Sequence, residues 1–299
     1  MKRHVGWISA AIALLSGTAL HAQEEHPVRQ LTSDSAQQGF PSWSPDGYTI
    51  VYSSVNRDDP EKTGLWKIPA DGGEPWQFTD FIGEHPNWSP DGQYIVFDAD
   101  SGSSIKLIAS HGGSPIHVVP GDVPVFRGGN PNWAPDGRRI AFREGPNLWV
   151  MDVSTGQAGI ALTRNGLYPI PGCWSNDGAD VFMVLRGSES NESEIWRVPV
   201  RGEEARQIVF EIDLLYRYMD LSPDGTLLVF TACKERACDL WMGAVDGGKP
   251  VQLTFHPAYD DTPRWSPDGT KIAFTSTRSG AFDVWVMEPD LEWIRAALE

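Results

Sequence analysis

The sequence Pro263-Arg264-Trp265-Ser266-Pro267-Asp268-Gly269 decides the fold of this chain, together with the run from Thr270 to Ser276 that follows it. The first part predicts a strand that ends in Trp265 and then a tight Pro-Asp-Gly turn. Pro presets the first turn position, Asp accepts a hydrogen bond from nearby backbone, and Gly adopts positive φ without steric cost. The second part alternates apolar with small polar residues, as a half-buried strand does. The two parts together predict a β-hairpin.

The same hairpin recurs along the chain and makes six copies in all. Successive Trp positions, with Leu in the fifth copy, are separated by 45, 45, 41, 47 and 44 residues. This spacing is the period of a four-stranded propeller blade. We therefore predict an all-β fold, a six-bladed β-propeller of four-stranded blades. The repeated positions are Trp43, Trp88, Trp133, Trp174, Leu221 and Trp265.

The two ends of the chain predict how the ring closes. The sixth repeat stops after its third strand, and the missing outer strand matches the segment Val28 to Thr32, which resembles Val251 to Thr254. We expect this segment to pair with Phe282 to Met287, because a closed ring leaves no open blade edge. The propeller is thus expected over residues 23–290, and the helical spacing of residues 291–299 predicts a short C-terminal helix.

The N-terminus has the pattern of a secretory signal peptide. Lys2 and Arg3 precede an apolar run from Val5 to Leu20, and Ala22 offers a small residue for cleavage. The alternative is an uncleaved anchor, but the run is shorter than the roughly 20 apolar residues that span a bilayer. We predict a signal peptide over residues 1–22, a periplasmic or secreted protein and no stable membrane insertion.

Charge and cysteine usage narrow the classes of partner. The chain has 24 Lys and Arg residues against 40 Asp and Glu residues, and its formal net charge is −16, so nucleic acid is not an expected partner. Cys233 and Cys238 flank a short polar connector, and in an oxidising compartment they are predicted to form a disulfide. The alternative, a metal site, lacks further ligands in that connector. Cys173 is expected to be a buried small residue.

The candidate binding site lies at one mouth of the central channel. The Pro-Asp-Gly turns share one face of the ring, and the more variable crossings between blades gather on the other face, where binding residues are usually found on a rigid scaffold. The alternative is that the acidic residues cap local turns and the tyrosines pack between blades. The predicted ligand- or partner-binding residues are Glu84, His85, Arg127, Asn130, Tyr168, Tyr216, Arg217, Tyr218, Asp260 and Asp261.

Catalytic and metal-binding signals are weak in the sequence. The chain has no Gly-x-Ser-x-Gly elbow, no His-Glu-x-x-His motif and no phosphate-binding glycine loop. Oxygen and nitrogen ligands for a metal are present near the mouth, but without paired-histidine spacing. We therefore predict no catalytic residue, no metal and no cofactor. The metal ligands considered are Glu84, His85, His256, Asp260 and Asp261.

The repeated hairpins, together with the Gly-Gly turns and the Gln-Leu-Thr ending of the repeats, resemble the TolB-type family of WD40-like bacterial propellers. The resemblance covers nearly all of the chain after residue 22. It implies a periplasmic scaffold of the cell envelope that binds a protein or peptide segment, with a Pal-like partner, and we expect a monomer. TolB has an N-terminal domain before its propeller, whereas only residues 23–27 precede the first strand here. Roles that depend on that domain are therefore in doubt.

Three functions remain open from the sequence. The leading hypothesis is the non-enzymatic, protein-binding scaffold. The second is a propeller lyase or hydrolase that acts on an acidic oligosaccharide, with His85, Asp260 and Asp261 at the channel mouth. The third is a periplasmic ligand sensor.

Overall fold

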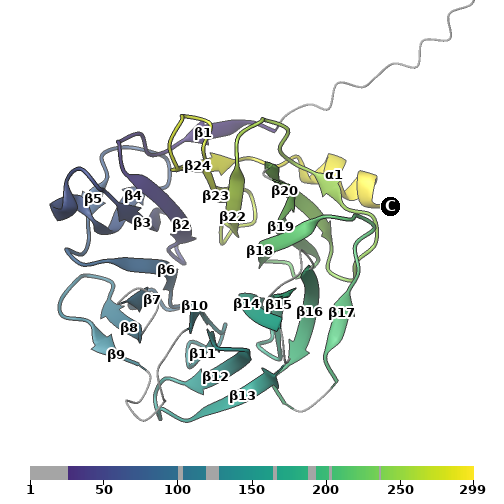
Figure 1. Cartoon of the computed structure of the whole chain (residues 1–299), viewed down its shortest axis with the longest axis horizontal. Coiled ribbons are helices and arrows are strands. Elements are labelled where there is room, and N and C mark those ends of the chain that lie inside the picture. The colour runs from purple at the N-terminus through teal and green to yellow at the C-terminus, as the bar shows by residue number, and fades with distance from the viewer. Residues whose placement is uncertain are drawn as a thin grey trace, which may run out of the picture.

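The computed structural model describes residues 26–99, 104–118, 128–163, 167–187, 193–201, 204–235 and 237–299. The predicted signal peptide lies outside these residues. The described chain forms six four-stranded antiparallel sheets arranged as a ring (Figure 1). The inner strand of each sheet contacts the inner strands of the two neighbouring sheets, and the sixth contacts the first. The predicted six-bladed β-propeller is therefore confirmed.

Each blade is a meander whose first strand lines the channel. The first blade is β2 (Gln37–Trp43), β3 (Thr49–Val55), β4 (Gly64–Pro69) and β5 (Trp76–Gln77); the second is β6 (Gly83–Trp88), β7 (Tyr94–Ala99), β8 (Ser104–Ala109) and β9 (Ile116–His117). The third is β10 (Gly128–Trp133), β11 (Arg139–Glu144), β12 (Asn147–Asp152) and β13 (Ala158–Thr163). The fourth is β14 (Leu167–Trp174), β15 (Asp180–Gly187), β16 (Ser193–Pro199) and β17 (Arg206–Ile208). The fifth is β18 (Leu215–Leu221), β19 (Leu227–Lys234), β20 (Ala237–Ala244) and β21 (Val251–Gln252).

The sixth blade combines the two ends of the described chain. It contains β22 (Asp260–Trp265), β23 (Ile272–Ser276), β24 (Asp283–Met287) and, as its outer strand, β1 (Val28–Gln30). Val28 pairs with Met287, and Thr32 then accepts the backbone N–H of Val284 at 2.9 Å through its hydroxyl. Thr79 and Thr254 accept third-strand N–H groups in the same way, both at 2.9 Å. This shared contact explains why the Gln-x-Thr ending recurs.

The repeated Ser and Asp of the hairpins are turn residues. In the first copy, the Ser44 hydroxyl donates to Asp46 Oδ1 at 2.5 Å, and Asp46 also accepts the Tyr48 N–H at 3.0 Å. These hydrogen bonds hold the pKa of Asp46 below its ordinary value. Gly47 supplies the positive φ, 78°, that the turn requires. The same Ser–Asp contact occurs at Ser89, Ser175, Ser222 and Ser266.

The repeated tryptophans and the residues before them join one blade to the next. Trp43 packs in a buried cluster with Ala273 and Val286 of the sixth blade, and its indole N–H donates to a backbone oxygen of that blade at 3.1 Å. The residue before the tryptophan binds the following blade: Asn87 Oδ1 accepts the Trp133 N–H at 2.8 Å. The one-blade spacing of the sequence repeat therefore matches a repeated contact between blades.

Two local features complete the fold. Cys233 and Cys238 form a disulfide across the β19–β20 hairpin, in which they are paired residues. The C-terminal helix α1 (Leu291–Leu298) begins at Asp290, whose carboxylate caps it, and it packs through the buried Ile294. Across the described ranges, no helix has the length and apolar character needed to cross a membrane.

Candidate functional site

The inner strand of four blades bends at a residue that is not glycine but has positive φ. Each of these residues lies three positions before the tryptophan and directly before Pro, where the pairing with the second strand shifts register. Such a bulge redirects side chains, and left-handed backbone is unfavourable for bulky residues, so it persists only where the surroundings hold it. The four residues are Phe40 (φ 54°), His85 (φ 48°), Asn130 (φ 56°) and Thr262 (φ 54°).

Three aromatic side chains at this level meet across the channel, and we call Phe40, His85 and Tyr218 the aromatic plug. Tyr218 occupies the corresponding position of the fifth blade, which faces the second blade across the ring (Figure 1). Its hydroxyl lies 3.5 Å from His85 Nε2, and the ring centroids of Phe40 and His85 are 4.0 Å apart. Burial raises the pKa of Tyr218 to about 12, so its phenol stays protonated at neutral pH. The plug therefore links the first and second blades to the fifth across the channel.

Second-strand side chains hold the bulges of the following blade. Asp98 on β7 is buried, and its Oδ2 lies 2.8 Å from His85 Nδ1 and accepts the Asn130 N–H at 3.0 Å. A Cβ at Gly129 would lie 2.3 Å from that oxygen, so the close approach requires glycine. Thr275, at the equivalent position of β23, accepts the Phe40 N–H at 3.3 Å. These contacts hold Phe40 and His85 in place in the plug.

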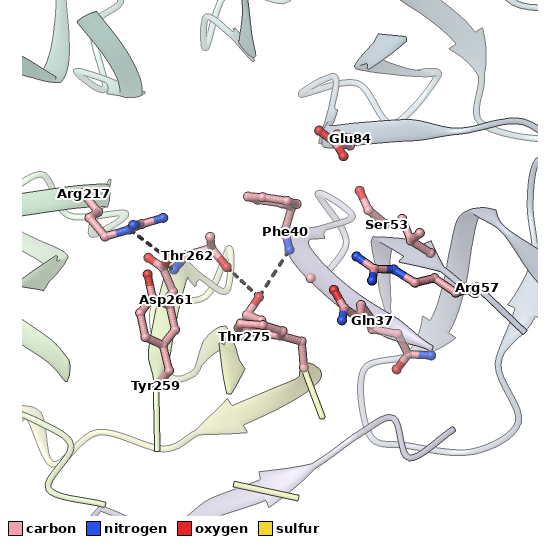
Figure 2. A pocket seen from close by; sticks show the side chains of 14 residues that line it. Gln37, Phe40, Ser53, Arg57, Glu84, Arg217, Tyr259, Asp261, Thr262 and Thr275 are labelled. Carbon is pink, nitrogen blue, oxygen red and sulfur yellow. Dashed lines mark hydrogen bonds and ion pairs between the residues drawn. The ribbon is translucent and has the colours of Figure 1, made fainter. Parts of the chain in front are cut away.

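A pocket of about 400 Å³ opens on the mouth side of the plug, between the first and sixth blades (Figure 2). Its wall from β2, β3 and the segment after β3 carries polar side chains, and its opposite wall comes from the fifth and sixth blades. Aromatic rings from both sides complete it. The lining residues are Gln37, Gln38, Gly39, Phe40, Ser53, Val55, Arg57, Glu84, Arg217, Tyr259, Asp261, Thr262, Thr275 and Phe282.

One wall of the pocket contains an ion pair. Arg217 Nε lies 3.1 Å from Asp261 Oδ2, and the guanidinium of Arg217 stands 5.6 Å from the ring of Tyr259 (Figure 2). Burial raises the pKa of Asp261, and the positive charge of Arg217 opposes that rise. Burial, followed by the charge of Asp261, raises the pKa of Tyr259, so Tyr259 presents a neutral hydroxyl. With both groups charged, the ion pair adds no net charge to the pocket.

Other polar groups of the pocket have no partner. The side chains of Arg57 and Glu84 form no hydrogen bond or ion pair with the described residues. The side-chain oxygens of Gln38 and Ser53 are buried, and each also lacks a hydrogen-bond partner within the described part of the chain. Buried polar groups are normally satisfied by hydrogen bonds. The pocket thus offers accessible charged groups of both signs, which a bound molecule can pair with.

The structure places the predicted site residues in three groups. Glu84, Arg217 and Asp261 line the pocket, and His85 and Tyr218 belong to the plug. Asn130 lies beside the plug: its N–H binds Asp98, and its buried Oδ1 has no partner among the described residues. The remaining predicted residues lie elsewhere or, for Arg127, outside the described residues.

Asp260, Tyr216 and Tyr168 do not line the pocket. Neighbouring side chains of a strand point to opposite sides, so Asp260 and Asp261 do not face the same way, and only Asp261 faces the mouth. Asp260 is fully buried and forms an ion pair with Arg278 at 2.7 Å. Tyr216 is buried between the fourth and fifth blades, where its ring lies 5.6 Å from that of Phe230. Tyr168 is exposed. For Tyr216, the structure agrees with packing between blades.

The structure adds residues that the sequence did not single out, above all Phe40, Thr262, Tyr259, Asp98 and Arg57. Aligning the repeats on their tryptophans would have found the first two, since both precede a Pro two positions before Trp. Asp98 lies ten residues after Trp88, as Thr275 lies ten after Trp265. Nothing in the sequence marks Arg57 or Tyr259.

The residues considered as metal ligands are not gathered at one point. Asp260 binds Arg278, and His256 Nδ1 accepts the N–H of Ala258 at 3.1 Å. Within the described ranges no group of three or more His, Cys, Asp or Glu side chains is placed to hold a metal ion. The set Glu84, His85, His256, Asp260 and Asp261 therefore does not form a metal site here.

The fold is similar to that of several propellers of known structure. The structure of a putative TolB from Agrobacterium tumefaciens superposes with a TM-score of 0.65 at 19% identity, over 88% of this chain and 97% of that one. An oligogalacturonate lyase in complex with manganese gives 0.62 at 16% identity, over 91% and 96%. A putative gluconolactonase gives 0.65 at 15%, over 89% and 92%.

These similarities establish a TolB-like propeller fold. No family model and no curated protein matches the chain. At such low identity the structural neighbours show the fold alone, and they include both TolB and propeller enzymes. Function must therefore be argued from the pocket.

Proposed function

We propose that this protein is a non-enzymatic binding module of the cell envelope, in the periplasm, and that its channel-mouth pocket holds a segment of a partner protein. The observation that carries the proposal is the pocket itself, which is lined by aromatic rings and by charged side chains of both signs, Arg57 and Glu84, that have no partner among the described residues. A cavity of this size matches those that hold small ligands or short segments. The likeness of the fold to TolB propellers supports the same reading.

The composition of the pocket suits a peptide. Protein interfaces combine aromatic residues and Arg at their centre with polar groups around them. Phe40, Tyr259 and Phe282 supply aromatic surface, while Arg57 and Glu84 supply charges near the opening.

Site-specific crosslinking tests the proposal. A photoreactive amino acid in place of Gln37, which is exposed and lines the pocket, is expected to form one discrete adduct with a partner in intact cells. Replacing Tyr259 by Ala should abolish the adduct, because that ring forms part of the pocket wall. A photoreactive group at the exposed Thr155, in a turn on the opposite face, is the control. No adduct from Gln37, or the same adduct from both positions, would contradict the proposal.

A second candidate is an enzyme that uses acid–base catalysis, favoured by the contact between His85 and Asp98. A carboxylate 2.8 Å from Nδ1 fixes the tautomer and orientation of an imidazole, as in many catalytic pairs. The similar fold of an oligogalacturonate lyase suggests acidic oligosaccharides as the first substrates to test. Turnover of oligogalacturonate that disappears in His85→Gln would establish this function, whereas no turnover by the wild-type protein, with or without added manganese, would remove it.

A further inference from the structure

Two charged side chains of the channel-mouth pocket are unpaired and have opposite signs. Arg57 follows β3 and is exposed, and Glu84 lies on β6 and is half-buried; neither forms an ion pair with a described residue. A single unpaired surface charge is ordinary. Here, however, both charges line one pocket, in which the other two charged residues, Arg217 and Asp261, already neutralise each other.

Arg57 and Glu84 come from different blades and form no ion pair with each other. They belong to neighbouring blades, and Figure 2 shows Glu84 on its own strand, β6, while Arg57 lies beside Gln37 of the first blade. The four charged residues that line the pocket sum to zero net charge. A ligand with one charge would leave either the guanidinium or the carboxylate without a counterion.

We infer that the pocket selects a dipolar peptide group, with a carboxylate bound by Arg57 and an ammonium bound by Glu84. This inference rests on the proposed binding function and specifies the chemistry of what is bound. Phe40, Tyr259 and Phe282 offer apolar surface for the part of the ligand between its two charges.

The dipolar group has two sources. A short free peptide carries an ammonium and a carboxylate at its ends, whereas a segment of a partner carries them as neighbouring basic and acidic side chains. The two sources share the same contacts in the pocket, but only the first binds without a second protein. A free peptide as ligand would make this protein a ligand sensor.

Four tripeptides test the inference directly. The probes are Ala-Phe-Ala with both ends free, its N-acetylated form, its C-terminal amide and the form with both ends blocked, and binding to the full chain is measured by calorimetry or NMR titration. The peptide with two free ends is expected to bind at least about tenfold more tightly than the doubly blocked peptide, since each charge-assisted contact adds affinity. Equal affinity for all four would overturn the inference.

Two substitutions separate the two contacts. Arg57→Gln should weaken only the peptides with a free carboxylate, by about three- to tenfold, and Glu84→Gln should weaken only those with a free ammonium. Arg201→Gln and Glu74→Gln, which change exposed residues outside the pocket, are the matched controls and should leave every affinity unchanged. Losses that do not follow this charge pattern would contradict the assignment.

The partner segment is tested by the same variants. If no free tripeptide binds, a fall in the Gln37 crosslink in both Arg57→Gln and Glu84→Gln would support the dipolar contact with a partner as its source. A crosslink that neither variant changes would refute the inference of a dipolar ligand while leaving the proposed binding function intact. Conversely, tripeptide binding with the expected charge pattern but no crosslink would retain the inference and refute a partner protein.

Discussion

Replacing Arg278 by Met is expected to destabilise the propeller by about 3–5 kcal/mol, the usual loss when one member of a buried ion pair is removed. Arg278 Nη2 lies 2.7 Å from Asp260 Oδ2, and the two side chains are 8% and 0% exposed. Without the guanidinium, the carboxylate of Asp260 would remain buried and unpaired. The measurement is the free energy of unfolding in urea at pH 7.

A second substitution shows whether the loss comes from the unpaired charge. Asp260→Asn in the Arg278→Met background should recover most of the stability, because it removes the charge that lost its partner. Arg138→Met is the control: Arg138 also pairs with an aspartate, Asp152, but its side chain is 65% exposed, so we expect less than about 1 kcal/mol. A loss as small as that of Arg138→Met would indicate that the stability of the fold does not depend on this ion pair. Asp260 would then again be a candidate binding residue.

The fold was predictable because its signals are local and repeated. Each hairpin contains its own turn residues, such as Ser44, Asp46 and Gly47, which form the same contacts in nearly every copy. The outer strand β1 was also recognisable, because Thr32 repeats the role of Thr79 and Thr254. A departure in one copy, such as Leu221 in place of Trp, does not hide the blade, because the spacing of the other copies still identifies it.

The candidate site was only partly predictable, because a bulge decides which side chains face the channel. Asp260 and Asp261 point to opposite sides, but the register shift between Asp261 and Arg264 prevents counting back from Trp265 to decide which of the two lines the pocket. Tyr216 and Tyr218 would share one side under strict alternation, and the register shift after Tyr216 separates them: the first packs between blades and the second enters the plug.

Contacts across the channel are the least accessible to sequence reasoning. His85 and Tyr218 meet although they are 133 residues apart, and the identity of neither residue predicts a partner on the opposite blade. The same holds for Arg57 and Glu84, whose significance depends on their having no partner. Such a property emerges only when the neighbours of each side chain are known.

Lys67 provides the second large effect, a dependence of stability on pH. Its side chain is buried between the first and second blades, with Nζ 2.6 Å from the Ser110 carbonyl oxygen and 3.6 Å from the ring centre of Phe78. It forms no ion pair with the described residues. Burial lowers the pKa of Lys67 from 10.5 to about 8. The charged form is therefore less favourable in the folded protein than in the unfolded chain.

The direction of the pH effect follows from this pKa. Between pH 8 and 10.5 the unfolded chain holds the Lys67 proton more strongly than the folded protein does, so stability rises with pH in that window. Each pKa unit corresponds to about 1.4 kcal/mol, which predicts a gain of about 2 kcal/mol between pH 7 and about pH 9.5. Lys67→Met should remove this gain, as measured by urea unfolding at the two pH values.

The comparison with a surface lysine isolates the effect of burial. Lys62 has a side chain that is 58% exposed and pairs with Asp59, so Lys62→Met should keep the wild-type rise in stability with pH. Lys67 does not line the pocket, so Lys67→Met is also expected to bind the tripeptides as the wild type does. If the rise with pH persisted in Lys67→Met, another group would be responsible, and Lys67 would be stabilised as a cation by the rings of Phe78 and Trp88.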